Sequence, residues 1–131
     1  SKSTTPDSLR FALSETPGDV VVIIGGRDKG LDFGDLLEPL HRERVKGIVL
    51  IGESRSRLHS VLNGHASRSV VRECETLGEA VRVADHLARP GTTVLLSPAC
   101  ASFDMFRDFE DRGRAFKAIV NTLTGGTRND G

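Results

Sequence analysis

The sequence has no excess of either charge and no long apolar run. Its 18 lysines and arginines balance 18 aspartates and glutamates, so no global field favours nucleic acid or a membrane surface as a partner. No apolar run approaches the roughly 20 residues of a membrane-spanning helix. No charged and then apolar leader opens the chain. These absences favour a soluble intracellular protein.

Cysteine is scarce, and metal-binding patterns are missing. The two cysteines, Cys74 and Cys100, have neither metal-ligand nor redox spacing. Cys100 lies between two alanines, and we expect it to be a small packed residue rather than a nucleophile. The four histidines are scattered, with no pair at metal-ligand spacing: His41, His59, His65 and His86. We therefore expect no metal site in this chain.

Short runs rich in β-branched residues predict four strands. They cover residues 20–24, 47–51, 69–72 and 92–96. The segments between them have helical periodicity, and this alternation predicts an α/β fold with a parallel sheet. The length suits one domain, which we place at residues 1–124, with a polar tail over residues 125–131.

Capping residues mark where the helices begin. Thr5 stands before a proline, which is typical of an N-cap followed by the first helical position. Ser54 predicts the start of a more basic helix, and Asp32 precedes another apolar stripe at helical spacing. Thr76 and Glu79 have the spacing of a capping box.

A last helix is predicted from Ser102 onward. Its apolar residues recur at alternating steps of three and four, which predicts a single stripe against the sheet. They are Phe106, Phe109, Gly113, Phe116, Val120 and Leu123. A helix that starts just after a strand offers free N–H groups and a positive dipole end to an anion. Ser102 is therefore a helix cap, an anion contact, or both.

A glycine-rich segment, GGRDKG over residues 25–30, follows the first predicted strand. It matches neither the dinucleotide-binding fingerprint nor the phosphate loop. Lys29 is either a solvated turn residue or an anion contact at the carboxyl end of that strand. The residues alone thus predict an α/β domain with an anion-binding edge.

Two segments together resemble the C-terminal domain of the Mur ligases. They are GGRDKGLDF over residues 25–33 and SPACASFDMFRDFEDRGRAF over residues 97–116. The longer motif is similar to that of the members that add D-glutamate. The members that add L-alanine, a diamino acid or a dipeptide have different signatures there. The resemblance implies a Rossmann-like, mostly parallel sheet flanked by helices.

The resemblance also implies an activity for the parent protein. It implies an ATP-dependent ligase of peptidoglycan precursor synthesis in the bacterial cytoplasm. In that family, ATP phosphorylates the carboxylate of UDP-N-acetylmuramoyl-L-alanine, and the amine of D-glutamate attacks the acyl phosphate. The UDP-binding domain and the ATPase domain, with the main ATP and Mg²⁺ sites, would lie outside this chain. We therefore expect an excised, monomeric domain with no catalytic residue and no ligase activity of its own.

Site residues follow from the same resemblance. The implied D-glutamate contacts are Thr4, Lys29, Ser102, Phe103 and Phe109. Lys29 would pair with a carboxylate, and Thr4 and Ser102 would hydrogen-bond the carboxylates through their hydroxyls. Phe109 would line the pocket, and Phe103 would follow Ser102 in the substrate-facing loop. Phe109 is otherwise a core residue. Lys2 matches a lysine close to the nucleotide and the acyl phosphate.

Two other functions remain open. A free-standing Rossmann-like module would bind a small dicarboxylate or a phosphorylated metabolite at the same edge. A hydrolase would use Ser97, Ser102 or Cys100, but the sequence has no Gly-x-Ser-x-Gly elbow around these residues.

Overall fold

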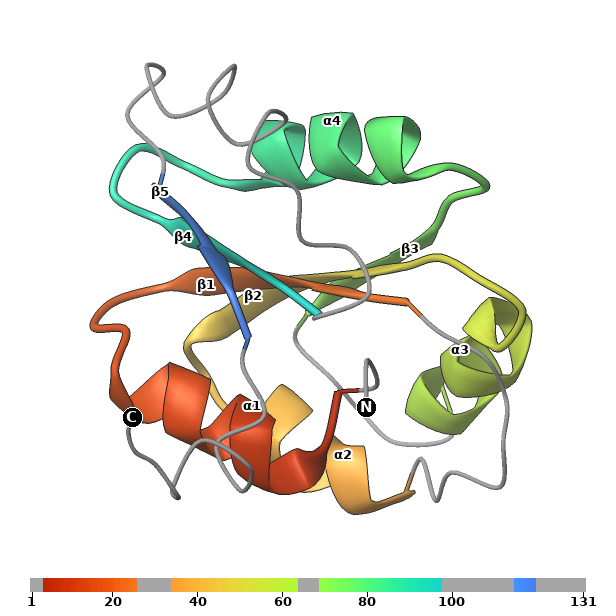
Figure 1. Ribbon diagram of the computed structural model, residues 1–131, viewed down its shortest axis with the longest axis horizontal. Helices are drawn as coiled ribbons and strands as arrows, with labels where there is room; N and C mark the ends of the chain where they lie inside the picture. Colours follow the sequence, from red (N-terminus) through yellow and green to blue (C-terminus); the bar gives the residue numbers. More distant parts are fainter. Residues whose placement is uncertain (1–3, 26–33, 64–68, 98–114, 120–131) are drawn as a thin grey trace, which may run out of the picture.

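A five-stranded sheet, in which every strand pairing is parallel, organises the protein (Figure 1). The computed structural model describes residues 4–25, 34–63, 69–97 and 115–119. The strands are β1 (Val20–Ile24), β2 (Val45–Leu50), β3 (Val70–Glu73), β4 (Thr93–Leu96) and β5 (Ala115–Ala118). The helices are α1 (Pro6–Ser14), α2 (Gly34–Leu40), α3 (Arg55–Asn63) and α4 (Leu77–Leu87). The strand order is β3-β2-β1-β4-β5.

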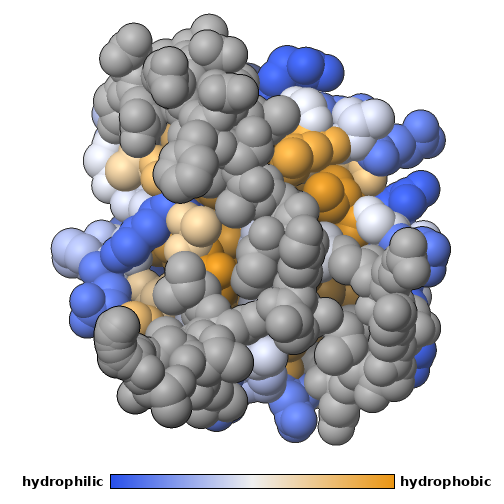
Figure 2. All heavy atoms as spheres, viewed as in Figure 1, coloured by the Kyte–Doolittle hydropathy of each residue, from blue (hydrophilic) through white to orange (hydrophobic). Residues whose placement is uncertain are grey.

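Helices cover both faces of the sheet, which buries its central strands. Figure 1 shows α1, α2 and α3 on one side and α4 on the other. All five residues of β1 are buried, and they divide between two apolar clusters, one on each face. A strand covered on both faces reads as a continuous apolar run. On the face drawn in Figure 2, the apolar residues gather toward the middle and the polar residues lie toward the margins. The predicted parallel α/β fold is confirmed.

Four of the five strands lie where the sequence predicts them. β1 has the predicted bounds, and β2, β3 and β4 differ from the prediction by one or two residues at their ends. The predicted helix starts after Thr5 and Ser54 are confirmed. None of the helices in the described segments is long and apolar enough to cross a membrane.

The fifth strand corrects the prediction of one helix that continues to Leu123. Residues 115–118 form β5, in which Phe116 pairs with Val94 of β4. Phe116 is buried against α4, whereas Lys117 is exposed. The pattern of residues 115–118 fits both the helical and the strand period. The segment forms a strand because it pairs with β4, whose edge would otherwise be open. The predicted start of that helix lies outside the described residues.

The capping box at Thr76 is only half formed. The Thr76 hydroxyl accepts a hydrogen bond from the Glu79 N–H at 3.1 Å, as the spacing predicts. The Glu79 carboxylate, however, accepts from the N–H of Glu75 at 2.8 Å and not from that of the N-cap residue. The Glu79 side chain therefore hydrogen-bonds Glu75, which lies just before the N-cap of α4.

Candidate functional site

The strand order reverses between β1 and β4, and this reversal positions the candidate site. From β1 the chain moves outward through β2 to β3, and it then returns to place β4 on the other side of β1. Such a switch point leaves a crevice outside the carboxyl ends of the two strands, where ligands of open α/β sheets bind. The segments 26–33 and 98–114 follow β1 and β4 directly in the chain. Both predicted binding segments therefore leave the sheet at its switch point.

A hydrogen bond joins the two strand ends at this point. The Gly25 N–H donates to the Ser97 hydroxyl oxygen at 3.2 Å, and the Ser97 N–H donates to the Ile23 carbonyl at 2.9 Å. Ser97 is completely buried. A nucleophile needs access to its substrate, so burial argues against the hydrolase that uses Ser97. Ser97 instead connects the carboxyl ends of β1 and β4.

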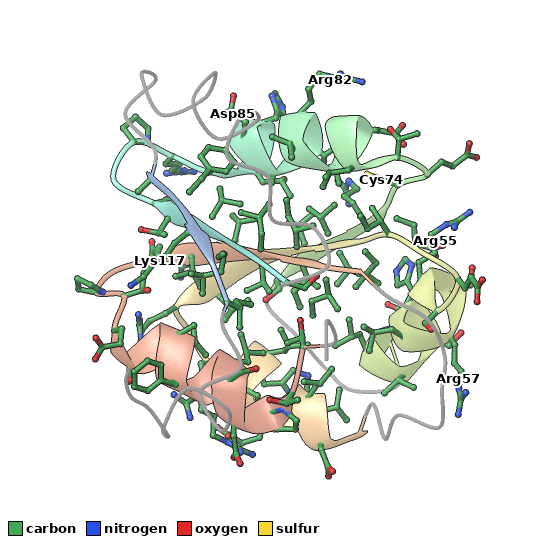
Figure 3. The ribbon with its side chains drawn as sticks, in the orientation of Figure 1. Arg55, Arg57, Cys74, Arg82, Asp85 and Lys117 are labelled. Atoms are coloured by element: carbon green, nitrogen blue, oxygen red, sulfur yellow. The ribbon has the colours of Figure 1, made fainter. Side chains whose placement is uncertain are left out.

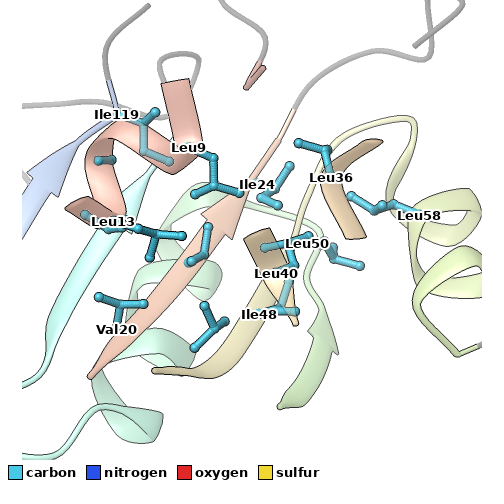
Figure 4. Close-up of a cluster of buried hydrophobic side chains, with 14 of the residues drawn as sticks. Leu9, Leu13, Val20, Ile24, Leu36, Leu40, Ile48, Leu50, Leu58 and Ile119 are labelled. Atoms are coloured by element: carbon cyan, nitrogen blue, oxygen red, sulfur yellow. The ribbon is translucent and has the colours of Figure 1, made fainter. Parts of the chain in front are cut away.

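The direction of α1 brings the beginning of the described chain to the same edge. Figure 4 shows Leu9 beside Ile24 and Ile119, and Leu13 beside Val20. All five side chains belong to one buried cluster. Helix α1 therefore runs antiparallel to β1, and its amino end lies at the edge where β1 ends.

Two adjacent threonines at the start of α1 differ in their hydrogen bonding. The Thr5 hydroxyl accepts from the Ser8 N–H at 3.1 Å, and the Ser8 hydroxyl accepts from the Thr5 N–H at 3.1 Å. This reciprocal pair is a capping box. The Thr4 residue is only 5% exposed, and its buried Oγ1 has no hydrogen-bond partner in the described structure. Thr5 stabilises the helix, and Thr4 has an unused polar atom.

A second buried hydroxyl without a partner lies along the same edge. Ser54 follows β2 and directly precedes α3, and its Oγ has no hydrogen-bond partner among the described atoms. Its residue is 7% exposed. Sequence reasoning assigned Ser54 only as a helix start. An unsatisfied buried hydroxyl costs about 1–3 kcal/mol of stability. The sequence pattern did not reveal that two such hydroxyls lie at one edge of the sheet.

A charged cluster extends this edge at the end of β3. The Glu73 carboxylate lies 2.6 Å from the His59 Nδ1 and accepts from the Ser56 hydroxyl at 3.1 Å. Arg55 Nε lies 3.9 Å from the same carboxylate, and Figure 3 shows Arg55 at the start of α3. These contacts, the His59 hydrogen bond first, lower the pKa of Glu73. The positions of the histidines in the sequence do not predict this cluster, because His59 and Glu73 come together only when α3 packs on β3.

The remaining candidates divide between described and undescribed residues. Lys2, Lys29, Cys100, Ser102, Phe103 and Phe109 lie outside the described residues. Cys74 is buried, and burial, with a smaller effect from Glu79, raises the pKa of its thiol. Such a thiol is a packing residue. Within the described segments, no group of three His, Cys, Asp or Glu side chains could hold a metal ion.

Comparison with known proteins gives a consistent set of relatives. Residues 1–100 match the family model described as the glutamate ligase domain of Mur ligases. The chain is 52% identical over 124 residues to a protein of Chlorobaculum tepidum, with 95% of this chain and 26% of the relative covered. It is 43% identical over 124 residues to one of Symbiobacterium thermophilum, with 95% and 27% covered. It is 44% identical over 123 residues to one of Chlamydia caviae, with 94% and 28% covered.

All three relatives have the same name, UDP-N-acetylmuramoylalanine–D-glutamate ligase. The aligned region covers only 26–28% of their length. The chain thus corresponds to about a quarter of these relatives.

Proposed function

Because this chain belongs to the Mur ligase family, through its glutamate ligase domain, we propose that it is the D-glutamate-binding domain of a ligase that joins D-glutamate to UDP-N-acetylmuramoyl-L-alanine. The names of relatives that are 42–52% identical support this reaction. The reaction belongs to cytoplasmic peptidoglycan precursor synthesis. As a domain of about a quarter of the relatives' length, this chain would supply one part of the active site.

The single observation that carries the proposal is the unpaired Oγ1 of Thr4. This hydroxyl is buried at the edge where β1 and β4 end, beside a threonine whose own hydroxyl caps α1. A buried hydroxyl without a partner is destabilising, and a ligand carboxylate that accepts its hydrogen bond would remove that cost. Thr4 is also the one proposed D-glutamate contact that lies in a described segment.

The proposed task of the domain is to position a nucleophile. ATP and Mg²⁺, bound mainly by parts of the parent enzyme outside this chain, would supply the acyl phosphate of UDP-N-acetylmuramoyl-L-alanine. The amine of D-glutamate then attacks the carbonyl carbon, an amide bond forms, and phosphate leaves. Fixing both carboxylates of D-glutamate holds its amine toward that carbon, and such orientation accounts for a large part of many rate enhancements.

Each proposed contact has a distinct role in this positioning. Lys29 pairs with one carboxylate of D-glutamate, and the hydroxyls of Thr4 and Ser102 donate hydrogen bonds to the carboxylates. Each such charge-assisted bond contributes about 1.5–3 kcal/mol. Phe103 and Phe109 line the pocket. Lys2 lies close to the acyl phosphate in this arrangement.

The adjacent threonines provide a matched test. D-glutamate is titrated into the wild type, Thr4→Val and Thr5→Val, and binding is followed by amide chemical shifts. We expect Thr4→Val to weaken binding about tenfold, the equivalent of one such hydrogen bond. Thr5→Val should lower stability and leave the D-glutamate affinity within about twofold of the wild type, because the Thr5 hydroxyl serves the helix.

Two outcomes would contradict the proposal. One is an equal D-glutamate affinity for the wild type and Thr4→Val. The other is a binding site that accepts L-glutamate as readily as D-glutamate, which would favour the free-standing dicarboxylate-binding module. Because the domain holds only one of the reactants, we also expect no turnover of ATP, UDP-N-acetylmuramoyl-L-alanine and D-glutamate by the chain alone.

A further inference from the structure

A cavity of about 430 Å³ opens at the amino edge of the sheet, opposite the switch point. Its lining comes from the starts of four strands and the end of α4: Asp19, Lys46, Val70, Leu87, Arg89 and Thr92. The volume falls within the range of about 300–1,000 Å³ that is typical of small-molecule sites. We propose that this cavity binds a small organic anion, whose phosphate or carboxylate group lies between Lys46 and Arg89.

A register shift of the kind that a β-bulge makes lies at Lys46, a residue that lines the cavity. Val20 of β1 pairs with Val45, but the next residue, Val21, pairs with Gly47. β2 therefore has one extra residue, Lys46, at this point. Such bulges re-aim a side chain and occur preferentially next to binding sites. Val45 is buried, whereas Lys46 is exposed and lines the cavity, so its ammonium group is available to a ligand there.

Gly47 lets Leu87, an apolar lining residue of the cavity, lie close to β2. A Cβ at this position would lie 3.1 Å from Leu87 Cδ1. The absence of a side chain therefore lets the last residue of α4 rest directly on β2. Val70, at the start of β3, is 37% exposed and lines the same space. Together, Leu87 and Val70 offer an apolar surface to the body of a ligand in the same cavity as the charged groups.

The charges around the cavity are not neutralised by one another. Lys46, Arg89 and Asp19 have no ion pair and no side-chain hydrogen bond in the described structure, although they line one space. The exposed Glu38, by contrast, is paired with both Arg10 and Arg42. Two cations and one carboxylate leave a net positive charge at the cavity, and this favours an anion. Asp19 repels that anion and directs it toward the two cations.

Phenyl phosphate and benzoate are suitable probes, because they share an apolar ring and differ in the anionic group. Benzyl alcohol is the neutral control. Each is titrated into the 131-residue chain, and amide shifts are recorded. We expect saturable shifts around Asp19, Lys46, Val70 and Thr92 with at least one of the two anions. The tighter of the two identifies the preferred group. Shifts that are as large with benzyl alcohol, or that spread over the whole surface, would overturn the proposal.

Variants with opposite expected effects make the test specific. Lys46→Ala and Arg89→Ala should each weaken binding of the better anion about fivefold, whereas Asp19→Asn should strengthen it about threefold. Arg82→Ala is the matched control, because Figure 3 shows Arg82 on the outer side of α4, away from the sheet. Binding by general charge alone would weaken equally in all three cation variants, and that result would overturn the proposal.

The result is independent of the proposed D-glutamate site. Lys46→Ala should leave D-glutamate binding unchanged, since the two sites lie at opposite edges of the sheet. The Asp19→Asn variant keeps the test decisive if a cation variant is too unstable to titrate, because an unchanged or weaker anion affinity in Asp19→Asn contradicts the assignment.

Discussion

The Gly25 amide donates a hydrogen bond to the Ser97 hydroxyl at 3.2 Å, and this bond joins the carboxyl ends of β1 and β4 where the strand order reverses. The two segments proposed to contact D-glutamate follow directly after Gly25 and Ser97 in the chain. The last described residues before these two segments are therefore joined by a bond between buried or half-buried groups of the sheet itself.

Loss of this bond should lower stability. Ser97→Ala removes the acceptor of the Gly25 N–H and leaves this group unsatisfied, which costs about 1–3 kcal/mol. The free energy of unfolding, measured with urea, should fall by that amount. Ser14→Ala is the control. The exposed Ser14 hydroxyl donates a hydrogen bond to Phe11 O at 2.7 Å, yet the loss of this bond should cost less than about 0.5 kcal/mol. Equal losses for the two variants would contradict the role given to Ser97.

The two adjacent threonines should differ in stability as well as in binding. Thr5→Val removes the N-cap of α1 and should cost about 1 kcal/mol. Thr4→Val replaces an unpaired buried hydroxyl by a methyl group of similar size, so stability should stay the same or rise by about 1 kcal/mol. Urea unfolding of both variants measures the difference. A loss of stability in Thr4→Val would mean that its hydroxyl has a structural partner.

Two glycine substitutions should have opposite signs. Gly47→Ala places a Cβ 3.1 Å from Leu87 Cδ1, which must then move by a few tenths of an ångström, and this crowding should cost about 1 kcal/mol. Gly78→Ala lies in α4, where the nearest atom is 3.8 Å away at the flexible end of Arg82. Alanine favours the helix, so this variant should gain about 0.5 kcal/mol. Thermal unfolding of the pair compares them, and a neutral Gly47→Ala would contradict the close contact between α4 and β2.

The contacts of Glu73 predict that the free energy of unfolding depends on pH in the acid range. The His59 hydrogen bond, with that of Ser56, holds the pKa of Glu73 below its ordinary value of 4.5. A carboxylate with a lowered pKa in the folded state stabilises the protein above its unfolded pKa, and this stability disappears as the pH falls through the folded pKa. The wild type should therefore be more stable than Glu73→Gln above pH 4.5, and the difference should vanish at lower pH.

Unfolding in urea at a series of pH values measures this difference. Glu53→Gln is the matched control, because no ion pair reaches the exposed Glu53 in the described part of the chain. A difference between wild type and Glu73→Gln that is the same at every pH would show that the carboxylate charge is not involved.

Much of the fold could be predicted, because the central strands are apolar runs of β-branched residues that can be recognised in the sequence alone. The run at residues 20–24 is entirely apolar and β-branched, and it is buried on both faces as β1. The segment at residues 115–118 has no such signal, since Phe116 fits a helical stripe as well as a strand. Only its pairing with β4, a contact made by the folded sheet, decides its structure.

The place of the candidate site in the sheet could be predicted, but its details could not. The strand-end positions of residues 25–30 and 97–102 indicate an anion-binding edge. The unpaired hydroxyls of Thr4 and Ser54 depend on what packs around them, which neighbouring residues in the sequence do not determine. The same holds for the amino-edge cavity, because a one-residue bulge at Lys46 has no distinctive sequence pattern.

The most direct test of the central claim is to map D-glutamate onto the chain. Amide shifts are recorded during titration of the wild type and Lys29→Ala. We predict saturable shifts at Thr4, Gly25 and Ser97 and in the segments 26–33 and 98–109, with much weaker binding by Lys29→Ala. Shifts that cluster instead at the amino edge, around Lys46 and Thr92, or an affinity unchanged in Lys29→Ala, would contradict a D-glutamate site at the switch point of this sheet.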